Sequence, residues 1–167
     1  MWVFALVLGM IAALLQSTFI PAVKISGGVI EIGVMLTLLF LFFGSLREAS
    51  VFLVIFAIFS TIFSQIPLIY FLLPTFVVIV IFIFLSRRRI ISRPGTLLSF
   101  LIFLIGTIIA DLVKLLIMAR FSLHNLLTVL IDALLTAFVG AIIYFLISKI
   151  YRYLNPQLDK EKIKLAE

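Results

Sequence analysis

The sequence contains no cysteine and only one histidine, His124, among its 167 residues. The lack of cysteine excludes disulfide bonds, thiolate metal sites and cysteine nucleophiles, and one histidine excludes a metal site built from several imidazoles. His124 falls in a polar turn, where we expect an interfacial residue and not a ligand. Neither a Gly-rich phosphate loop nor a nucleophile beside a base is visible. We therefore expect no enzymatic activity, no metal and no cofactor.

Charged residues are also scarce, at 12% of the chain against about 25% in soluble domains. Hydrophobic residues make up 65% of the chain, and the mean hydropathy is +1.42. The apolar runs are too long for a soluble core, so we predict a membrane protein with several spanning helices. The first run follows Met1 directly, without the basic start of a cleaved signal peptide, and we expect it to be retained.

The apolar runs predict six spanning helices, each of roughly 17–25 residues. We expect them at residues 1–20, 30–46, 49–65, 68–86, 97–119 and 126–150. Prolines and short polar turns separate them, and Pro74 predicts a kink in the fourth. The predicted fold class is an all-α membrane protein, with a transmembrane domain over residues 1–154 and a short polar tail over residues 155–167.

Lysine and arginine are distributed unequally over the two sides of this arrangement. With six spans, both termini lie on one side, and so do most basic residues: Arg47, Arg87, Arg88, Arg89, Arg93, Lys149, Arg152, Lys160, Lys162 and Lys164. Only Lys24 and Arg120 lie on the other side. The positive-inside rule therefore predicts cytoplasmic termini. The run Arg87–Arg89 with Arg93 predicts a cytoplasmic anchor to lipid headgroups, or a docking site for a cytoplasmic partner. The net charge of +6 thus concerns topology and lipid, and we expect no nucleic-acid partner.

Three charged residues interrupt the last two apolar runs: Asp111, Lys114 and Asp132. A charge inside a membrane span costs about 2.5–3.5 kcal/mol or more, so it usually faces protein or water. The helical rise places Asp111 about 12 Å and Asp132 about 9 Å from the outer end of their helices. Lys114 shares a helix face with Asp111. Gln16 and Glu31 are expected near the same depth, which predicts one polar cluster in the outer half of the membrane.

Three interpretations of this cluster stay open. It is an internal clasp, with Lys114 pairing to Asp111 or Asp132 and holding the last two helices together, or a contact site for the transmembrane helix of a partner. It is otherwise part of a substrate or proton pathway, although the inner half offers little beyond Thr37 and Ser99 to continue one. An aspartyl protease would need a Gly-rich stretch at the second aspartate, which Asp132 lacks.

Small residues recur at helical spacing on the first and last predicted helices. Gly9 and Ala13 form a short pair, and the last helix carries Ala133, Ala137, Gly140 and Ala141. Such rows let helix backbones approach closely in lipid. They predict either packing within the chain or a face that receives a partner's helix.

The layout resembles MreD-type rod-shape-determining proteins, which are small bacterial inner-membrane proteins with five or six spans. An acidic residue, Glu31, opens the second helix as in that family, although the family commonly has Pro-Asp where this chain has Ile30-Glu31. Three stretches carry the remaining resemblance: Leu15-Gln16-Ser17-Thr18-Phe19-Ile20-Pro21, Gly44-Ser45-Leu46-Arg47-Glu48-Ala49 and Tyr151-Arg152-Tyr153-Leu154.

The resemblance implies a non-enzymatic role in bacterial cell shape and lateral wall synthesis. The partners it implies are membrane lipids, MreC-like proteins, RodA/penicillin-binding-protein-type membrane proteins and the MreB-type cytoskeleton. The family's fold is similar to that of S components, the substrate-binding subunits of energy-coupling-factor vitamin transporters, and such a subunit is the alternative. S components bind a vitamin on the outer side and engage their partner through small residues of the first helix, where Gly9 and Ala13 would fit. The short linker Ala22–Gly28 is unlike their long polar first loop.

Overall fold

The computed structural model describes residues 2–19, 28–43, 45–87, 95–119 and 122–154. Within these ranges the regular secondary structure consists of six α-helices and one π-helix. The helices are α1 (Trp2–Leu14), the π-helix η1 (Leu15–Phe19), α2 (Ile32–Phe43), α3 (Leu46–Ser64), α4 (Leu68–Arg87), α5 (Thr96–Met118) and α6 (Leu123–Leu154).

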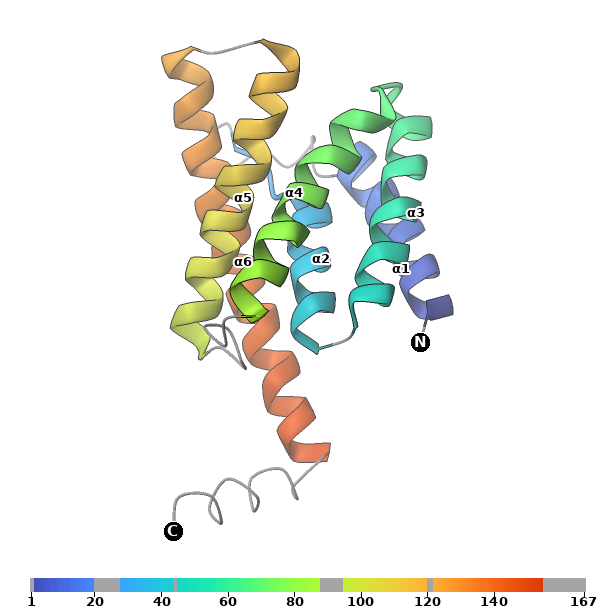
Figure 1. Cartoon of the computed structure of the whole chain (residues 1–167), viewed down its shortest axis with the longest axis vertical. Helices are drawn as coiled ribbons and strands as arrows, with labels where there is room; N and C mark the ends of the chain where they lie inside the picture. The colour runs from blue at the N-terminus through green and yellow to red at the C-terminus, as the bar shows by residue number, and fades with distance from the viewer. Residues whose placement is uncertain (1, 20–27, 44, 88–94, 120–121, 155–167) are drawn as a thin grey trace.

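Successive α-helices run in opposite directions, so the start of α1 and the end of α6 lie toward the same end of the bundle (Figure 1). The closest packing joins α5 to α6 on one side of the molecule and α1 to α3 on the other. Helices α2 and α4 lie between these two pairs (Figure 1). The molecule therefore has two helical halves with α2 at their junction.

Helix α2 contributes to the hydrophobic core of both halves. Its residues Val34 and Leu38 pack in a cluster with Phe103 of α5 and Ala137 of α6. Its first residue, Ile32, packs in a second cluster with residues of α1 and α3. Because most of its side chains are buried, α2 is the central element of the fold.

Four helices are long and apolar enough to cross a membrane: α3, α4, α5 and α6. The chain is therefore a helical membrane protein. The first apolar run forms a shorter helical segment made of α1 and η1, and α2 has only 12 residues. At 1.5 Å per residue α2 is about 18 Å long, well short of a hydrocarbon core of about 30 Å.

The predicted helix over residues 30–46 is wrong at both ends. Residues 28–31 are not helical, and the backbone carbonyl of Glu31 accepts the first helical hydrogen bond, from the N–H of Met35 at 3.0 Å. At the start, side chains of α6 and η1 bind N–H groups of residues 29, 31 and 32 and hold the chain in a non-helical path before α2. At the other end, the helical residues stop at Phe43.

The turn predicted over residues 44–48 is wrong in its second half, where α3 has already begun. Ser45 is the N-cap, and its hydroxyl accepts a hydrogen bond from the N–H of Glu48 while the Glu48 carboxylate accepts one from the N–H of Ser45. This capping box has a sequence signature, Ser-x-x-Glu, that marks a helix start. The last helix also exceeds its predicted bounds of 126–150, because Ser122 binds the N–H of Asn125 and starts α6 at Leu123.

Candidate functional site

The segment over residues 28–31, just before α2, is non-helical chain held between η1, α5 and α6. Backbone N–H groups at membrane depth find no water, so non-helical chain is tolerated there only where protein satisfies it. Three N–H groups of this segment and the first residue of α2 bind side chains from elsewhere in the fold.

Each of these N–H groups donates to a different side chain. The N–H of Val29 donates to Oδ1 of Asp132 at 2.5 Å, and the N–H of Glu31 donates to Oγ1 of Thr136 at 2.9 Å. Asp132 and Thr136 are four residues apart, so they share one face of α6. This face of α6 therefore holds the residues just before α2 in position.

The third N–H, that of Ile32, donates to Oε1 of Gln16 at 2.7 Å. The first residues of an α-helix have no intrahelical acceptor for their N–H groups, so this bond caps the start of α2. Gln16 lies in η1, and short π-helical turns occur frequently at functional sites. The predicted polar residue Gln16 thus acts on backbone, and it joins the first half of the molecule to α2.

Gly28 is the residue that allows the chain to come this close to α6. A Cβ atom at Gly28 would overlap Cγ2 of Ile131 and would lie 3.0 Å from Oδ1 of Asp132. Gly28 is buried. A glycine is therefore needed here because of the close approach of backbone to helix.

Lys114 lies at the centre of the charged part of the site. Its Nζ is 2.7 Å from Oε1 of Glu31 and 2.8 Å from Oδ1 of Asp111, and all three side chains are at least four-fifths buried. The same Nζ lies 6.0 Å from the centre of the Tyr70 ring, within the range of a cation–π contact. The ammonium therefore links α5 to the start of α2 and lies near α4.

The predicted clasp is present in a different form. Lys114 pairs with Asp111, one of the two partners predicted for it. It also pairs with Glu31, which the sequence predicted at a similar depth but not as a partner of Lys114. No ion pair joins Lys114 to Asp132 within the described ranges. The reason is geometric, since the Asp132 carboxylate is turned to the N–H of Val29. The ionic clasp thus connects α5 to α2 and not α5 to α6.

A small polar pocket of about 150 Å³ lies beside the clasp. Its walls come from the start of α2 and from α4, α5 and α6, and its lining residues are Glu31, Tyr70, Asp111, Lys114, Leu115, Asn125, Thr128, Val129 and Asp132. Oδ2 of Asp111 is buried and has no hydrogen-bond partner among the described residues. The carboxylates of Glu31 and Asp111 bind the ammonium and that of Asp132 also lines the pocket, so the pocket can accept a further hydrogen-bond donor.

The small residues of α6 pack within the chain. Ala133 and Ala137 are fully buried, and a Cβ atom at Gly140 would meet the ring of Phe103 at 3.0 Å. Ala141 lies at the edge of this row, on the wall of a shallow apolar groove beside α5. A partner's helix would reach Ala133 or Ala137 only if α5 and α6 separated.

The small residues of α1 also face the interior. Ala13 is fully buried, and a Cβ atom at Gly9 would lie 3.1 Å from the side chain of Ile55 and 3.2 Å from the carbonyl oxygen of Phe52. Gly9 therefore lets α1 pack closely against α3. These residues are occupied by packing within the chain.

Other predicted residues lie at or beyond the edge of the described structure. Arg87 is the last residue of α4, but its side chain is outside the described part, as are Arg88, Arg89 and Arg93. His124 is exposed in the first turn of α6. Among the residues that the structure does describe, no group of three His, Cys, Asp or Glu side chains could hold a metal ion.

Sequence reasoning missed two members of the site, Thr136 and Tyr70. Thr136 was detectable, because it lies one helical turn after Asp132 and must share its face. Tyr70 had no such signal, since its place beside Lys114 depends on how α4 packs on α5.

Comparisons of the chain with protein-family models, with curated proteins and with solved structures give no match.

Proposed function

We propose that this protein is a non-enzymatic membrane scaffold that acts through protein–protein contacts within the bilayer, in bacterial cell-shape control and lateral wall synthesis. The observation that carries the proposal is how the buried polar groups are used. Lys114, Asp132, Thr136 and Gln16 bind parts of the same chain, so their hydrogen bonds and ion pairs hold the fold together. This use of the polar groups supports a structural role for them.

The exposed surface of α6 supports a role in protein–protein contacts. An exposed apolar row runs along α6 at helical spacing, and its members are Leu127, Leu130, Leu134 and Phe138. In a membrane protein such a row faces lipid or another helix. The resemblance to MreD-type proteins supplies the biological setting, with MreC-like and RodA/penicillin-binding-protein-type partners in the inner membrane.

The proposal includes six crossings with both termini in the cytoplasm, in an S-component-like bundle. Helix α2 is about 18 Å long, and the four non-helical residues before it add at most roughly 13 Å at 3.3 Å each. A hydrocarbon core is about 30 Å thick, so helix and preceding segment together approach that thickness. The segment held against α6 thus supports a crossing made partly of helix and partly of non-helical chain. A reporter fused after Glu167 tests the topology, and an extracytoplasmic signal would contradict it.

Photo-crosslinking in the native host tests the scaffold role. A photoreactive residue at Phe138, which is 63% exposed, should capture MreC-like or RodA/penicillin-binding-protein-type proteins, while the same residue at the fully buried Ala137 should not. Recovery of those proteins at Phe138 alone supports the proposal. Equal recovery at both positions, or none at Phe138 and the other exposed positions of this α6 row, contradicts it.

The second candidate function is an S component of an energy-coupling-factor vitamin transporter. The polar pocket beside Lys114 favours it, because it lies toward the α5–α6 turn, the expected outer side. Its volume of about 150 Å³ is below the 300–1,000 Å³ that is typical of small-molecule sites. Gly9 and Ala13 are also packed against α3, and thus are not available to a partner. Recovery of an ATPase module together with a bound vitamin would establish this candidate and exclude the scaffold.

A further inference from the structure

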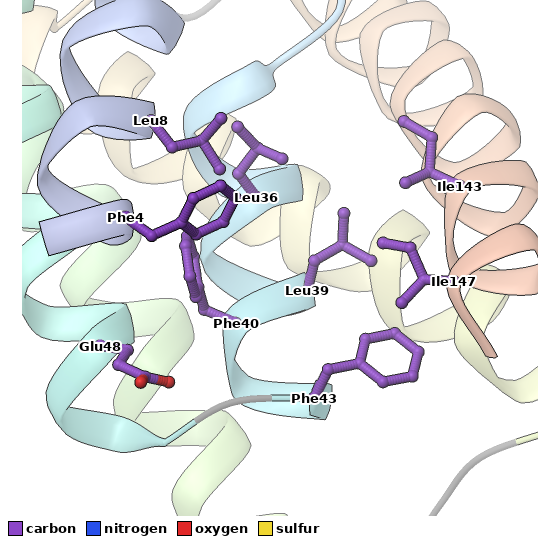
Figure 2. A pocket seen from close by; sticks show the side chains of 9 residues that line it. All are labelled: Phe4, Leu8, Leu36, Leu39, Phe40, Phe43, Glu48, Ile143 and Ile147. Atoms are coloured by element: carbon purple, nitrogen blue, oxygen red, sulfur yellow. The ribbon is translucent and has the colours of Figure 1, made fainter. Parts of the chain in front are cut away.

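An apolar groove of about 330 Å³ opens at the side of the bundle, at the opposite end of α2 from the polar site (Figure 2). Helix α2 forms its floor, α1 forms one wall, and α6 forms the other. The lining residues are Phe4, Leu8, Leu36, Leu39, Phe40, Phe43, Glu48, Ile143 and Ile147. All of them are apolar except Glu48.

The size of the groove decides what can fill it. A helix with side chains is about 10 Å across, so 330 Å³ would hold only about 4 Å of its length, less than one turn. A narrow hydrocarbon chain fits such a space. In a bilayer the surrounding solvent is lipid, and an unfilled groove would lose dispersion contacts along its lining. A lipid acyl chain is therefore the occupant that the shape and the setting favour.

The one charged residue that lines the groove selects the headgroup. The Glu48 carboxylate lies at the edge of the groove, below Phe4 and Phe40 (Figure 2), and it accepts a hydrogen bond of 3.1 Å from the N–H of Ser45. That bond involves one of its two oxygens, so the carboxylate can accept further donors. A cationic headgroup with N–H donors therefore suits this edge of the groove.

We propose that this groove binds one phospholipid with an ethanolamine headgroup, its acyl chain between α1 and α6 and its ammonium on Glu48. A primary ammonium has three donors for the carboxylate. A glycerol headgroup brings no cation to Glu48, and the choline headgroup brings a cation that cannot donate a hydrogen bond. The lipid fills the space between α1 and α6, beside α2. This site is separate from the polar cluster and does not depend on the proposed scaffold role.

The test is competitive lipid retention by the full chain. The protein is reconstituted into vesicles of equal parts phosphatidylethanolamine and phosphatidylglycerol, extracted in mild detergent, and examined by native mass spectrometry. One retained phosphatidylethanolamine is expected, in preference to phosphatidylglycerol. In vesicles where phosphatidylcholine replaces phosphatidylethanolamine, the zwitterionic lipid should lose this preference. Equal retention of all three lipids, or a co-purified protein helix in place of lipid, overturns the proposal.

Two pairs of variants locate the site. Glu48→Gln keeps the capping box, since Gln also serves at this position, but removes the charge. It should lower the preference for phosphatidylethanolamine roughly tenfold, the effect of one charge-assisted hydrogen bond. Lys149→Gln removes an exposed charge from the late part of α6 and should leave the preference unchanged. An unchanged preference in Glu48→Gln overturns the headgroup assignment.

The second pair tests the acyl chain. Ile143→Trp fills the groove and should abolish retention of the lipid, whereas Leu146→Trp adds the same bulk on an outward face, at a residue that is 51% exposed. Equal retention by the two variants, with both folded by circular dichroism, overturns the proposal. If Ile143→Trp fails to fold, Ile147→Phe, a smaller addition on the same wall, makes the same test.

Discussion

The two ends of α2 are built in opposite ways. Its start is held by directional bonds, with Lys114, Asp132, Thr136 and Gln16 reaching it from three other elements. Its end borders an apolar groove, where α1 and α6 stand apart and only α2 lies between them (Figure 2). The difference shows how one short helix can be fixed in position at one end and leave room for lipid at the other.

The lipid environment determines which interactions can fix each end of α2. Between apolar surfaces in a membrane there is little hydrophobic driving force, because lipid tails are as apolar as leucine. Hydrogen bonds and ion pairs therefore specify where α2 starts, and packing alone governs where it ends. Substitutions of the charged residues at the polar start should consequently cost more than substitutions at the apolar end, and the following predictions test that order.

The largest effect is expected for Lys114→Met, which leaves Glu31 and Asp111 buried without their counter-ion. Removal of one partner from a buried ion pair costs about 3–5 kcal/mol. The free energy of unfolding, measured by SDS titration in detergent micelles, should fall by about this amount. Lys149→Met, at an exposed position, is the matched control and should change little. Adding Glu31→Gln and Asp111→Asn to Lys114→Met should recover most of the loss.

The second-largest loss of stability is expected for substitution of Asp132. Two different substitutions there separate the effect of the charge from that of the hydrogen bond. Asp132→Ala leaves the N–H of Val29 without an acceptor, which costs about 1–3 kcal/mol. Asp132→Asn keeps the Oδ1 acceptor and should lose less. The same unfolding measurement serves, with hydrogen exchange at the Val29 amide as a local readout. Equal losses in the two variants would contradict the assigned role of Asp132.

Gly28→Ala tests the close approach of the chain before α2 to α6. The added methyl overlaps Ile131, and overpacking of this kind costs about 1–3 kcal/mol. Gly95→Ala is the control, because nothing lies within 4 Å of a Cβ atom there. Its expected cost is a few tenths of a kcal/mol. If the two variants are equally stable, residues 28–31 are not held against α6 as described.

Phe43→Leu tests the apolar end of α2. The Phe43 ring lies 5.1 Å from the Tyr144 ring and 6.5 Å from the Tyr151 ring, centre to centre. An aromatic pair contributes about 0.5–1.5 kcal/mol beyond its buried area, so the unfolding free energy should fall by roughly 1 kcal/mol. A loss as large as that of Lys114→Met would reverse the proposed order of the two ends.

The smallest effect is expected for Thr136→Val, which keeps the shape but removes the acceptor for the N–H of Glu31. Hydrogen bonds between helices in membranes contribute about 0.6 kcal/mol on average. Thr128→Val is the control, since the Thr128 hydroxyl donates within its own helix, to the carbonyl of His124. A double-mutant cycle with Asp132→Asn shows whether the two residues act together on this segment.

The sequence predicts the helices well where local pattern decides them. Apolar runs identify all six, and the spacing of Asp111 and Lys114 predicts their pairing because a helix alone brings them together. The common depth of Asp111 and Asp132 follows from counting residues along two helices. These predictions need only helical geometry.

The remainder depends on how helices pack, which no local pattern contains. Glu31 reaches Lys114 only because α2 starts late and its preceding segment lies against α6. Pairing of Asp132 with Lys114 was one of two alternatives, but Asp132 binds a backbone N–H because Val29 lies beside it. The groove at the other end of α2 likewise arises from the separation of α1 and α6, far apart in sequence.

Helix α6 has 32 residues, so it is about 48 Å long. Even with a tilt of about 20°, it exceeds a hydrocarbon core of about 30 Å by roughly 15 Å. The bundle therefore carries a stiff extension at the end where α6 leaves its neighbours (Figure 1). Its last turns therefore lie beyond the hydrocarbon, at the depth of the lipid headgroups and the water next to them.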